Sequence, residues 1–200
     1  MIFFDFNIRI TQRLNEEQIA TLSNETQVDR DIIEMYAKKG WLRSEKQSKD
    51  LFLVWGKDGE IVGANKLTSD YQIATPFKGS SSKDSFIVTI GDRPKDIILF
   101  EQPLDSLEYI TSNRNQINNC VLICSREGDL SKQYTIEKVN EYLKTSRVDN
   151  IDIISKSDNS EKIKSNIINH LEFENKGKNT MNFDFNIESK QHLNIFDKTL

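Results

Sequence analysis

Charged side chains follow each of three short apolar segments in the second half of the chain. The segments are 97–100, 120–124 and 151–154, and the charged residues after them are Glu101, Asp105, Arg126, Glu127, Asp129, Lys156 and Asp158. Carboxylates that converge from several turns supply the oxygen ligands that Mg²⁺ prefers. An ion held in this way would bind phosphate oxygens and stabilise the charge that develops in phosphoryl transfer. The same residues could instead be helix caps and solvated loop residues, and spacing alone leaves both interpretations open.

A second stretch places basic residues around Trp41. They are Lys38, Lys39, Arg43, Lys46 and Lys49, and Glu45 is the one opposing charge within this stretch. Basic side chains beside an aromatic ring suit a nucleic acid, because the cations contact phosphates while the ring stacks on a base. The alternative is a solvated loop in which Trp41 packs into the core directly after Gly40. For Trp41 itself we favour this packing.

The two cysteines, Cys120 and Cys124, flank three apolar residues. In a strand, this even spacing puts both thiols on the same face of the sheet. We expect them to be buried and reduced. A zinc site is not expected, because His170 and His192 lie far from them in sequence.

The elements that position the charged turns follow from hydrophobic patterning. Apolar residues at helical spacing predict helices over about 101–111, 131–144 and 158–171, which alternate with the three apolar segments. Apolar strands that alternate with helices indicate an α/β fold with a parallel sheet covered on both faces. We therefore predict that the three segments are neighbouring parallel strands. Glu101 and Asp158 would then lie at the same sheet edge, close enough to share an ion or a water network.

The first half of the chain has a different pattern. Strands are expected at 1–10 and 86–90, helices at 15–22 and 28–39 with Gly40 as the C-cap, a hairpin at 51–55 and 60–67 around Asp58-Gly59, and a loop at 77–84. This half therefore predicts an α+β arrangement. We divide the chain into an N-terminal α+β module over 1–94, an α/β domain over 95–175, and a C-terminal strand and tail over 176–200.

Composition sets the broad class of protein. The 200 residues are 36% hydrophobic and 29% charged, which is typical of a foldable, polar protein. The formal net charge is −4, so binding of nucleic acid would have to rest on a local basic patch. No apolar stretch reaches the length of a membrane span, and no basic region precedes the apolar N-terminus. We expect a cytoplasmic protein without membrane contact.

Five stretches carry a resemblance to a known family. They are VDRDIIE at 28–34, KKG at 38–40, DGEIVGA at 58–64, FKGSS at 77–81 and ILFEQPLDSL at 98–107. In order and spacing, they resemble the Toprim-containing proteins of plasmids and conjugative elements. Those proteins combine an N-terminal module with a C-terminal Toprim-like domain. The resemblance covers roughly 25–172, and its most specific part is the strand-Glu-x-Pro-apolar-Asp block at 97–107.

The resemblance implies a Toprim site with a degenerate metal motif. Glu101 matches the glutamate that acts as general acid/base or metal ligand, and Asp105 matches an aspartate of the following helix. Asp158 matches the second aspartate of the Asp-x-Asp pair that holds Mg²⁺, whereas Lys156 stands in place of the first. Because a lysine ammonium repels the ion, we expect weak binding of Mg²⁺. Glu127 and Asp129 are the alternative candidates for a replacement ligand.

Three functions follow as hypotheses. The first is a mobile-element protein that binds nucleic acid or a nucleoprotein without cutting, through Lys156, Lys38, Lys39, Arg43, Lys46 and Arg126. The second is a Mg²⁺-dependent nuclease or primase-related enzyme with Glu101 and Asp158 as catalytic residues and metal ligands. The third is a counter-defence protein of the anti-CRISPR type that inhibits a host nuclease or its guide RNA. A complete primase is not expected, because the chain lacks a Cys/His zinc module and room for a polymerase region.

Overall fold

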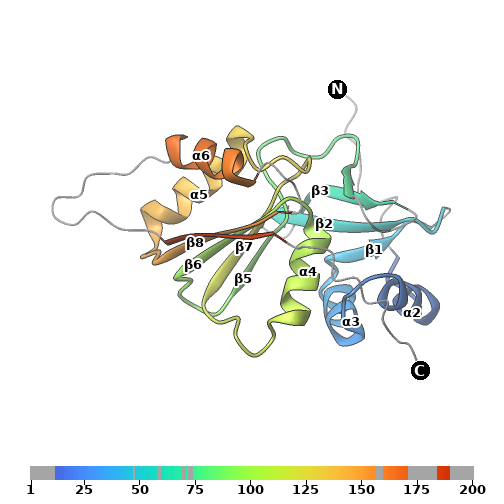
Figure 1. Cartoon of the computed structure of the whole chain (residues 1–200). Coiled ribbons are helices and arrows are strands. Elements are labelled where there is room, and N and C mark those ends of the chain that lie inside the picture. The colour runs from blue at the N-terminus through green and yellow to red at the C-terminus, as the bar shows by residue number, and fades with distance from the viewer. Residues whose placement is uncertain are drawn as a thin grey trace.

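The computed structural model describes residues 12–46, 48–57, 60–68, 71, 74–155, 160–170 and 184–189. Its strands form two sheets that lie side by side in Figure 1. The first, sheet A, consists of β1 (Leu42–Ser44), β2 (Leu51–Lys57), β3 (Glu60–Leu67) and β4 (Ala74–Pro76). The second, sheet B, consists of β5 (Ile87–Ile90), β6 (Asp96–Phe100), β7 (Cys120–Cys124), β8 (Asn150–Ser155) and β9 (Asp184–Ser189).

The described helices are α2 (Glu16–Glu25), α3 (Arg30–Lys39), α4 (Pro103–Ser112), α5 (Gln133–Thr145) and α6 (Ser160–His170). Their ends follow local sequence signals. Asn15 caps α2 by accepting a hydrogen bond from the backbone N–H of Gln18, and the Gln18 side chain returns the bond. Helix α3 ends at Gly40, which has a left-handed φ of 76°. Pro103 occupies the first turn of α4, where a missing N–H costs nothing.

Sheet A is antiparallel in the strand order of the sequence. The predicted hairpin is confirmed as β2 and β3, although its Asp58-Gly59 turn lies outside the described residues. Gly63 is required where the two strands meet, because a Cβ there would lie 2.3 Å from the ring of Trp55. Trp55 is thereby held against the backbone of β3 and stays 5% exposed.

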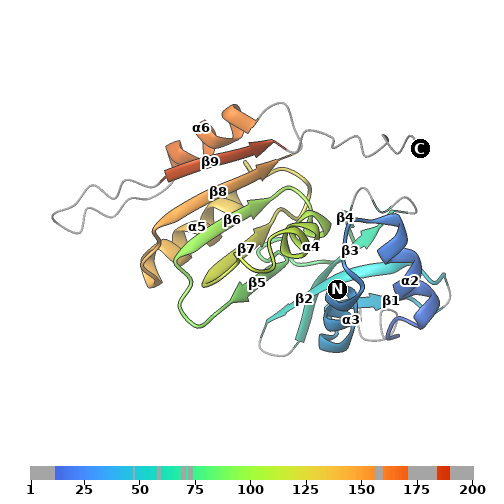
Figure 2. The same ribbon diagram turned by 60° about the horizontal axis from the view of Figure 1, so that its bottom comes forward.

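Sheet B has the order β5-β7-β6-β8-β9 (Figure 2). Strand β6 pairs in parallel with β7 on one side and with β8 on the other, which confirms the predicted parallel core. Strand β9 extends the parallel part beyond β8, whereas β5 pairs antiparallel with β7 and forms the opposite margin. Strand β9 lies within the 176–200 segment, for which a strand was expected.

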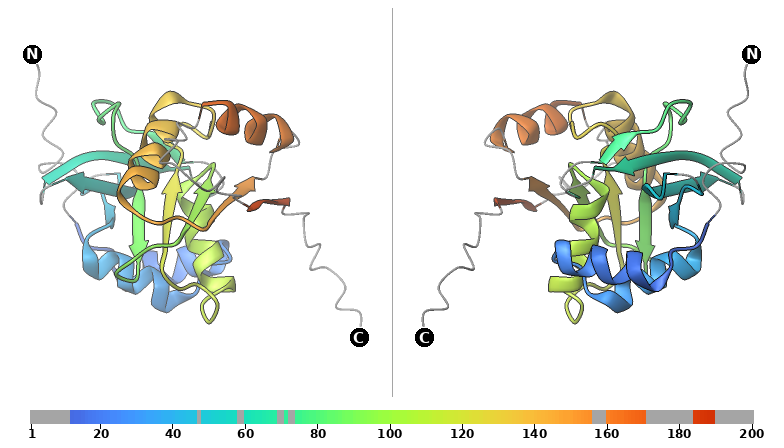
Figure 3. Two further views of the ribbon diagram at one scale, coloured as in Figure 1. Left: turned by 90° about the vertical axis from the view of Figure 1, so that its left-hand side faces the viewer. Right: turned by 90° about the vertical axis from the view of Figure 1, so that its right-hand side faces the viewer.

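Alternate residues of the sheet B strands belong to two different cores, as expected for a sheet buried on both faces. One core contains Ile98, Phe100 and Leu122 together with residues of α4 and α3. The other contains residues at the odd strand positions, such as Ile97 and Leu99, packed with residues of α5 and α6. Figure 3 shows α5 and α6 on one side of the sheet and α4 on the other.

The two cysteines lie on the same face of sheet B, as their spacing predicted. Both side chains belong to the core on the α4 side. Both are free thiols and buried. Burial raises the pKa of Cys120 to about 11 and that of Cys124 to about 12, so both stay protonated at neutral pH. These thiols therefore act as small apolar core groups.

The two halves of the chain share one hydrophobic core. Tyr36 of α3 packs against Phe86, with 6.1 Å between the ring centroids, and both belong to the cluster that contains Phe100 of β6. Strand β5 was assigned to the module over 1–94 by its place in the sequence, but it pairs with β7 in sheet B. The change from one sheet to the other therefore falls between β4 and β5.

The strand predicted over 1–10 lies outside the described residues. Among the described helices, none is long and apolar enough to cross a membrane.

Candidate functional site

The carboxyl ends of the parallel strands bring two predicted turns of the sequence together. Glu101 directly follows β6 and is half-buried. Its Oε1 accepts a hydrogen bond of 2.9 Å from the hydroxyl of Ser155, the last residue of β8. The backbone N–H of Ser125, after β7, donates to the carbonyl of Phe100 at 2.7 Å. Neighbouring parallel strands therefore fix the position of Glu101 at this edge of sheet B.

A cleft of about 710 Å³, lined mostly by residues with polar side chains, opens at this edge of the sheet. Its walls come from the end of β6, from the β7–α5 loop and from α6: Glu101, Gly128, Asp129, Ser131, Lys162, Ile163, Ser165, Asn166 and Asn169. Glu101 and Asp129, which were predicted as metal ligands from separate turns, thus line one cleft. Lys162 adds a cation, and the serines and asparagines add neutral donors and acceptors.

Asp129 is bonded within its own loop. Its Oδ1 accepts hydrogen bonds from the backbone N–H of Ser131 at 2.9 Å and from the Ser131 hydroxyl at 2.6 Å. The Lys132 ammonium lies 3.7 Å from Oδ2. Burial by itself would raise the pKa of this carboxyl, but the contacts with Ser131 and Lys132 outweigh burial, and the pKa is lowered. Asp129 is therefore ionised at neutral pH, with its oxygens already engaged.

The donor set in the described part of the chain fits a resident metal ion poorly. Among those residues, no group of three or more His, Cys, Asp or Glu side chains could hold a metal. Glu101 and Asp129 each accept hydrogen bonds from serine, and Lys162 lines the same cleft. A hard divalent ion is held by several oxygen ligands, and a nearby ammonium weakens its binding.

Two predicted site residues, Lys156 and Asp158, lie outside the described residues. The expected proximity of Glu101 and Asp158 therefore stays a prediction. Asp105, which matches the helix aspartate of the resemblance, is 3% exposed in the first turn of α4. A carboxylate at that position is favoured by the helix dipole.

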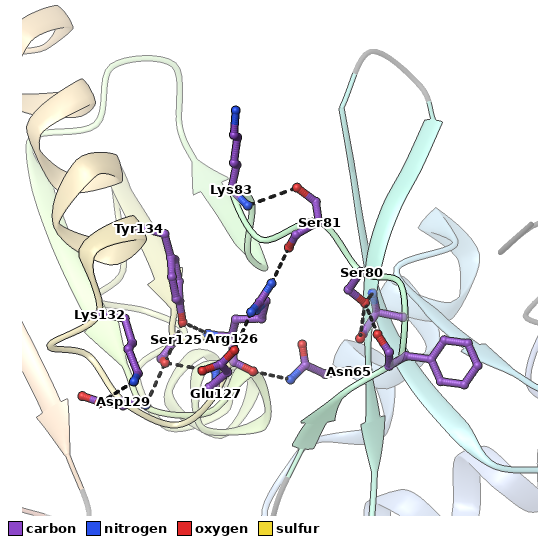
Figure 4. A network of polar contacts seen from close by, with 12 residues as sticks. Asn65, Ser80, Ser81, Lys83, Ser125, Arg126, Glu127, Asp129, Lys132 and Tyr134 are labelled. Carbon is purple, nitrogen blue, oxygen red and sulfur yellow. Dashed lines mark hydrogen bonds and ion pairs between the residues drawn. The ribbon is translucent and has the colours of Figure 1, made fainter. Parts of the chain in front are cut away.

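The loop that carries Asp129 is held by a network of polar contacts (Figure 4). The Ser125 hydroxyl lies 2.9 Å from the Tyr134 hydroxyl and accepts a hydrogen bond of 2.8 Å from the backbone N–H of Asp129. Asn65 of β3 donates from Nδ2 to the carbonyl of Arg126 at 3.0 Å. The network therefore ties the cleft loop of sheet B to sheet A.

Arg126 was predicted to contact nucleic acid, and the structure places its side chain inside this network. Its Nη1 donates to the carbonyl of Ser81 at 2.7 Å, its Nη2 pairs with Glu127, and the side chain is 15% exposed. The guanidinium carbon lies 5.8 Å from the ring centroid of Tyr134. These contacts give Arg126 a structural role between the 77–86 loop and the cleft loop.

We expect replacement of Arg126 by alanine to lower the free energy of unfolding by about 1–3 kcal/mol, because the change leaves the partly buried carbonyl of Ser81 without its donor. Urea unfolding followed by circular dichroism measures the change. Arg147 is a matched control, because its side chain is 86% exposed and pairs with Asp149 at the surface. Arg147→Ala should cost less than about 1 kcal/mol. Equal costs for the two variants would contradict the structural role of Arg126.

Of the basic residues around Trp41, some are exposed to solvent, whereas Arg43 is held against the backbone. Lys38, Lys39 and Lys46 are exposed. Arg43 is half-buried and its Nε donates to the carbonyl of Gly40 at 2.8 Å. Trp41 is partly buried against the core, as we favoured, and meets Tyr36 edge to face at 5.3 Å between centroids. The Lys39 ammonium lies 4.4 Å from the Trp41 ring centroid.

Several residues of the cleft and its network were not identified from the sequence: Asn65, Tyr134, Lys162, Ser165, Asn166 and Asn169. Asn65 did carry a signal, since it is a polar residue inside an apolar strand and is 0% exposed. Buried polar side chains usually make specific hydrogen bonds. The residues of α6 carried no such signal, because a polar helix face is usually a solvated one.

Comparisons with known proteins give one weak structural likeness. No family model matches the chain, and no curated protein matches it. A solved structure of bacteriophage T7 lagging-strand DNA polymerase, interacting with the primase domains of two gp4 subunits bound to an RNA/DNA hybrid and dTTP, contains a similar chain. The TM-score is 0.45 at 13% sequence identity, over 70% of this chain and 61% of that chain. A likeness of this size assigns the protein to no family.

Proposed function

We propose that this protein is a nucleic-acid-associated protein of a mobile element, and that its Toprim-like domain binds nucleic acid rather than cutting it. The observation that carries the proposal is the composition of the cleft. It holds two carboxylates already bonded to serines, one lysine, and a set of hydroxyls and amides. The sequence block at 97–107, which resembles the Toprim motif around Glu101, supplies the family context.

The donors of the cleft suit a nucleic-acid strand. Lys162 is exposed on α6 and can neutralise a phosphate, while Asn166 and Asn169 from the same helix can hydrogen-bond to base edges or sugar hydroxyls. Lys38 and Lys46 are also exposed and carry positive charge, although they lie far from the cleft residues in the sequence. Since the net charge is −4, such binding would depend on these local groups and weaken steeply with salt.

Cleavage is not supported by the same residues. A Toprim ion would activate a water and stabilise charge on the phosphoryl group, and both effects require the ion to be held by clustered carboxylates. Glu101 and Asp129 are bonded to serines, and Lys156 in the metal-motif position adds a positive charge. A lysine can neutralise a phosphate as a point charge but cannot activate a water as a metal does.

Binding to fluorescein-labelled single-stranded DNA and RNA tests the proposal. We expect the anisotropy change to be the same, within about twofold, in EDTA and in Mg²⁺, and Lys162→Glu to weaken binding about tenfold because one phosphate contact becomes repulsive. Lys95→Glu is a matched control with the same charge change. Lys95 is exposed and directly precedes β6, at the end of sheet B opposite the cleft. Equal losses for the two variants would show that binding does not use the cleft.

The enzyme hypothesis is the main alternative, and one experiment separates it. End-labelled DNA and RNA are incubated with the protein in Mg²⁺ and resolved on a denaturing gel. Intact substrate supports binding without cleavage. Cleavage that Glu101→Gln abolishes would replace the proposal with a Mg²⁺-dependent nuclease.

A further inference from the structure

A groove of about 370 Å³ lies on the side of the molecule formed by α3, β5 and α4, where none of the lining residues belongs to the cleft. Its walls are mainly apolar and include Met35, Trp41, Ile90 and Ile117. Met35 is 37% exposed, and no other large hydrophobic side chain in the described part of the chain is exposed to this extent. An apolar groove that holds an exposed methionine is typical of a surface that binds a partner.

The strand beside this groove has an open edge. In the part of the chain that the structure describes, strand β5 is the marginal strand of sheet B and pairs only with β7. The backbone N–H of Cys124 donates to the carbonyl of Phe86, so the ladder uses the backbone groups of every second residue from Phe86 onward. The N–H and C=O of Ile87 and Thr89 therefore point away from β7. Thr89 is exposed and also lines the groove, so the open edge and the groove are continuous.

The charges of the groove have one sign. Its charged lining residues are Lys39 and Arg114. Arg114 pairs with Asp31 through Nη2, and Asp31 is not a lining residue. The Lys39 ammonium rests over the ring of Trp41, and no carboxylate within 4.0 Å is recorded for it in the described part of the chain. An occupant that carries carboxylates would therefore be attracted.

We propose that β5 and this groove bind an extended peptide segment of a partner protein. The segment would add as a strand to the open edge, with its main chain bonded to Ile87 and Thr89. One large apolar side chain would enter the groove between Met35 and Trp41. Flanking Asp or Glu residues would face Lys39 and Arg114. A nucleic-acid strand fits less well, because the groove is mainly apolar and Trp41 is already packed between Tyr36 and Lys39.

Selection from a random peptide library displayed on phage tests the proposal on the full chain. We expect enriched peptides to share one large apolar residue flanked by acidic residues, and to bind with affinities in the micromolar range. Thr89→Pro should weaken these peptides about tenfold, because it removes an outward N–H and blocks the edge. Proline is tolerated where the N–H faces away from the neighbouring strand, so the pairing with β7 should persist. Thr89→Val, which keeps the N–H, is the matched control and should bind as the wild type does.

Circular dichroism checks that Thr89→Pro is folded. Met35→Glu provides a second variant at an exposed position, and it should also weaken binding because it places a carboxylate in the groove. Peptides enriched equally on wild type and on both variants, or no enrichment on wild type, would overturn the proposal. Binding of a labelled oligo-dT strand that quenches Trp41 fluorescence and is lost in Lys39→Glu would also overturn it, in favour of a nucleic-acid occupant.

Discussion

Replacing Phe100 by alanine should lower the free energy of unfolding by about 3–5 kcal/mol. Phe100 is 0% exposed at the end of β6, the central strand of sheet B. Its ring meets that of Tyr109 from α4 edge to face, with 5.4 Å between centroids. Truncation removes this contact and leaves a cavity that the sheet, held by pairing on both sides, can close only in part. Because domains are stable by only about 5–15 kcal/mol, the loss would be a large share of the total.

Urea unfolding of the wild type and the variant, followed by circular dichroism, measures this loss. Phe100→Leu should cost less, because most of the apolar volume remains. Met35→Ala is a control of the opposite kind, since Met35 is 37% exposed on the surface of α3. Its cost should stay below about 1 kcal/mol. If Phe100→Ala were no more destabilising than Met35→Ala, the packing of α4 against β6 would be wrong.

Lys156→Asp should strengthen Mg²⁺ binding by about tenfold or more, since it restores the Asp-x-Asp pattern with Asp158. The change alters the local charge by two units, so repulsion of the ion is removed and attraction is added. The same change should weaken metal-free binding of nucleic acid, because a phosphate contact is lost. Lys156 and Asp158 lie outside the described residues, and this prediction rests on the sequence resemblance alone.

Isothermal titration with MgCl₂ and anisotropy in EDTA measure the two effects separately. Lys95→Asp is the matched control, because it makes the same charge change at the opposite end of sheet B. It should leave both quantities unchanged. Unchanged affinity for Mg²⁺ in Lys156→Asp would show that position 156 does not belong to a metal site.

The sequence by itself was enough to predict the strands and helices of the α/β part. The apolar segments at 97–100, 120–124 and 151–154 are strands buried on both faces, and short apolar segments that alternate with amphipathic helices are typical of such strands. Helix ends could also be predicted from the sequence, because they depend on local residues. Pro103 begins α4 and Gly40 ends α3 through backbone conformations that depend on a few neighbouring residues.

The tertiary structure alone decided how these elements combine into a site. The sequence order places β5 with the first half of the chain, whereas pairing places it at the margin of sheet B. Lys162 and Asn166 line the cleft because α6 packs beside the carboxyl ends of the strands. Arg126 donates a hydrogen bond within the protein because the carbonyl of Ser81 lies next to it in space. These outcomes depend on contacts between residues distant in the chain. Periodicity reports which face of an element is apolar, but it carries no information about which other element meets the polar face.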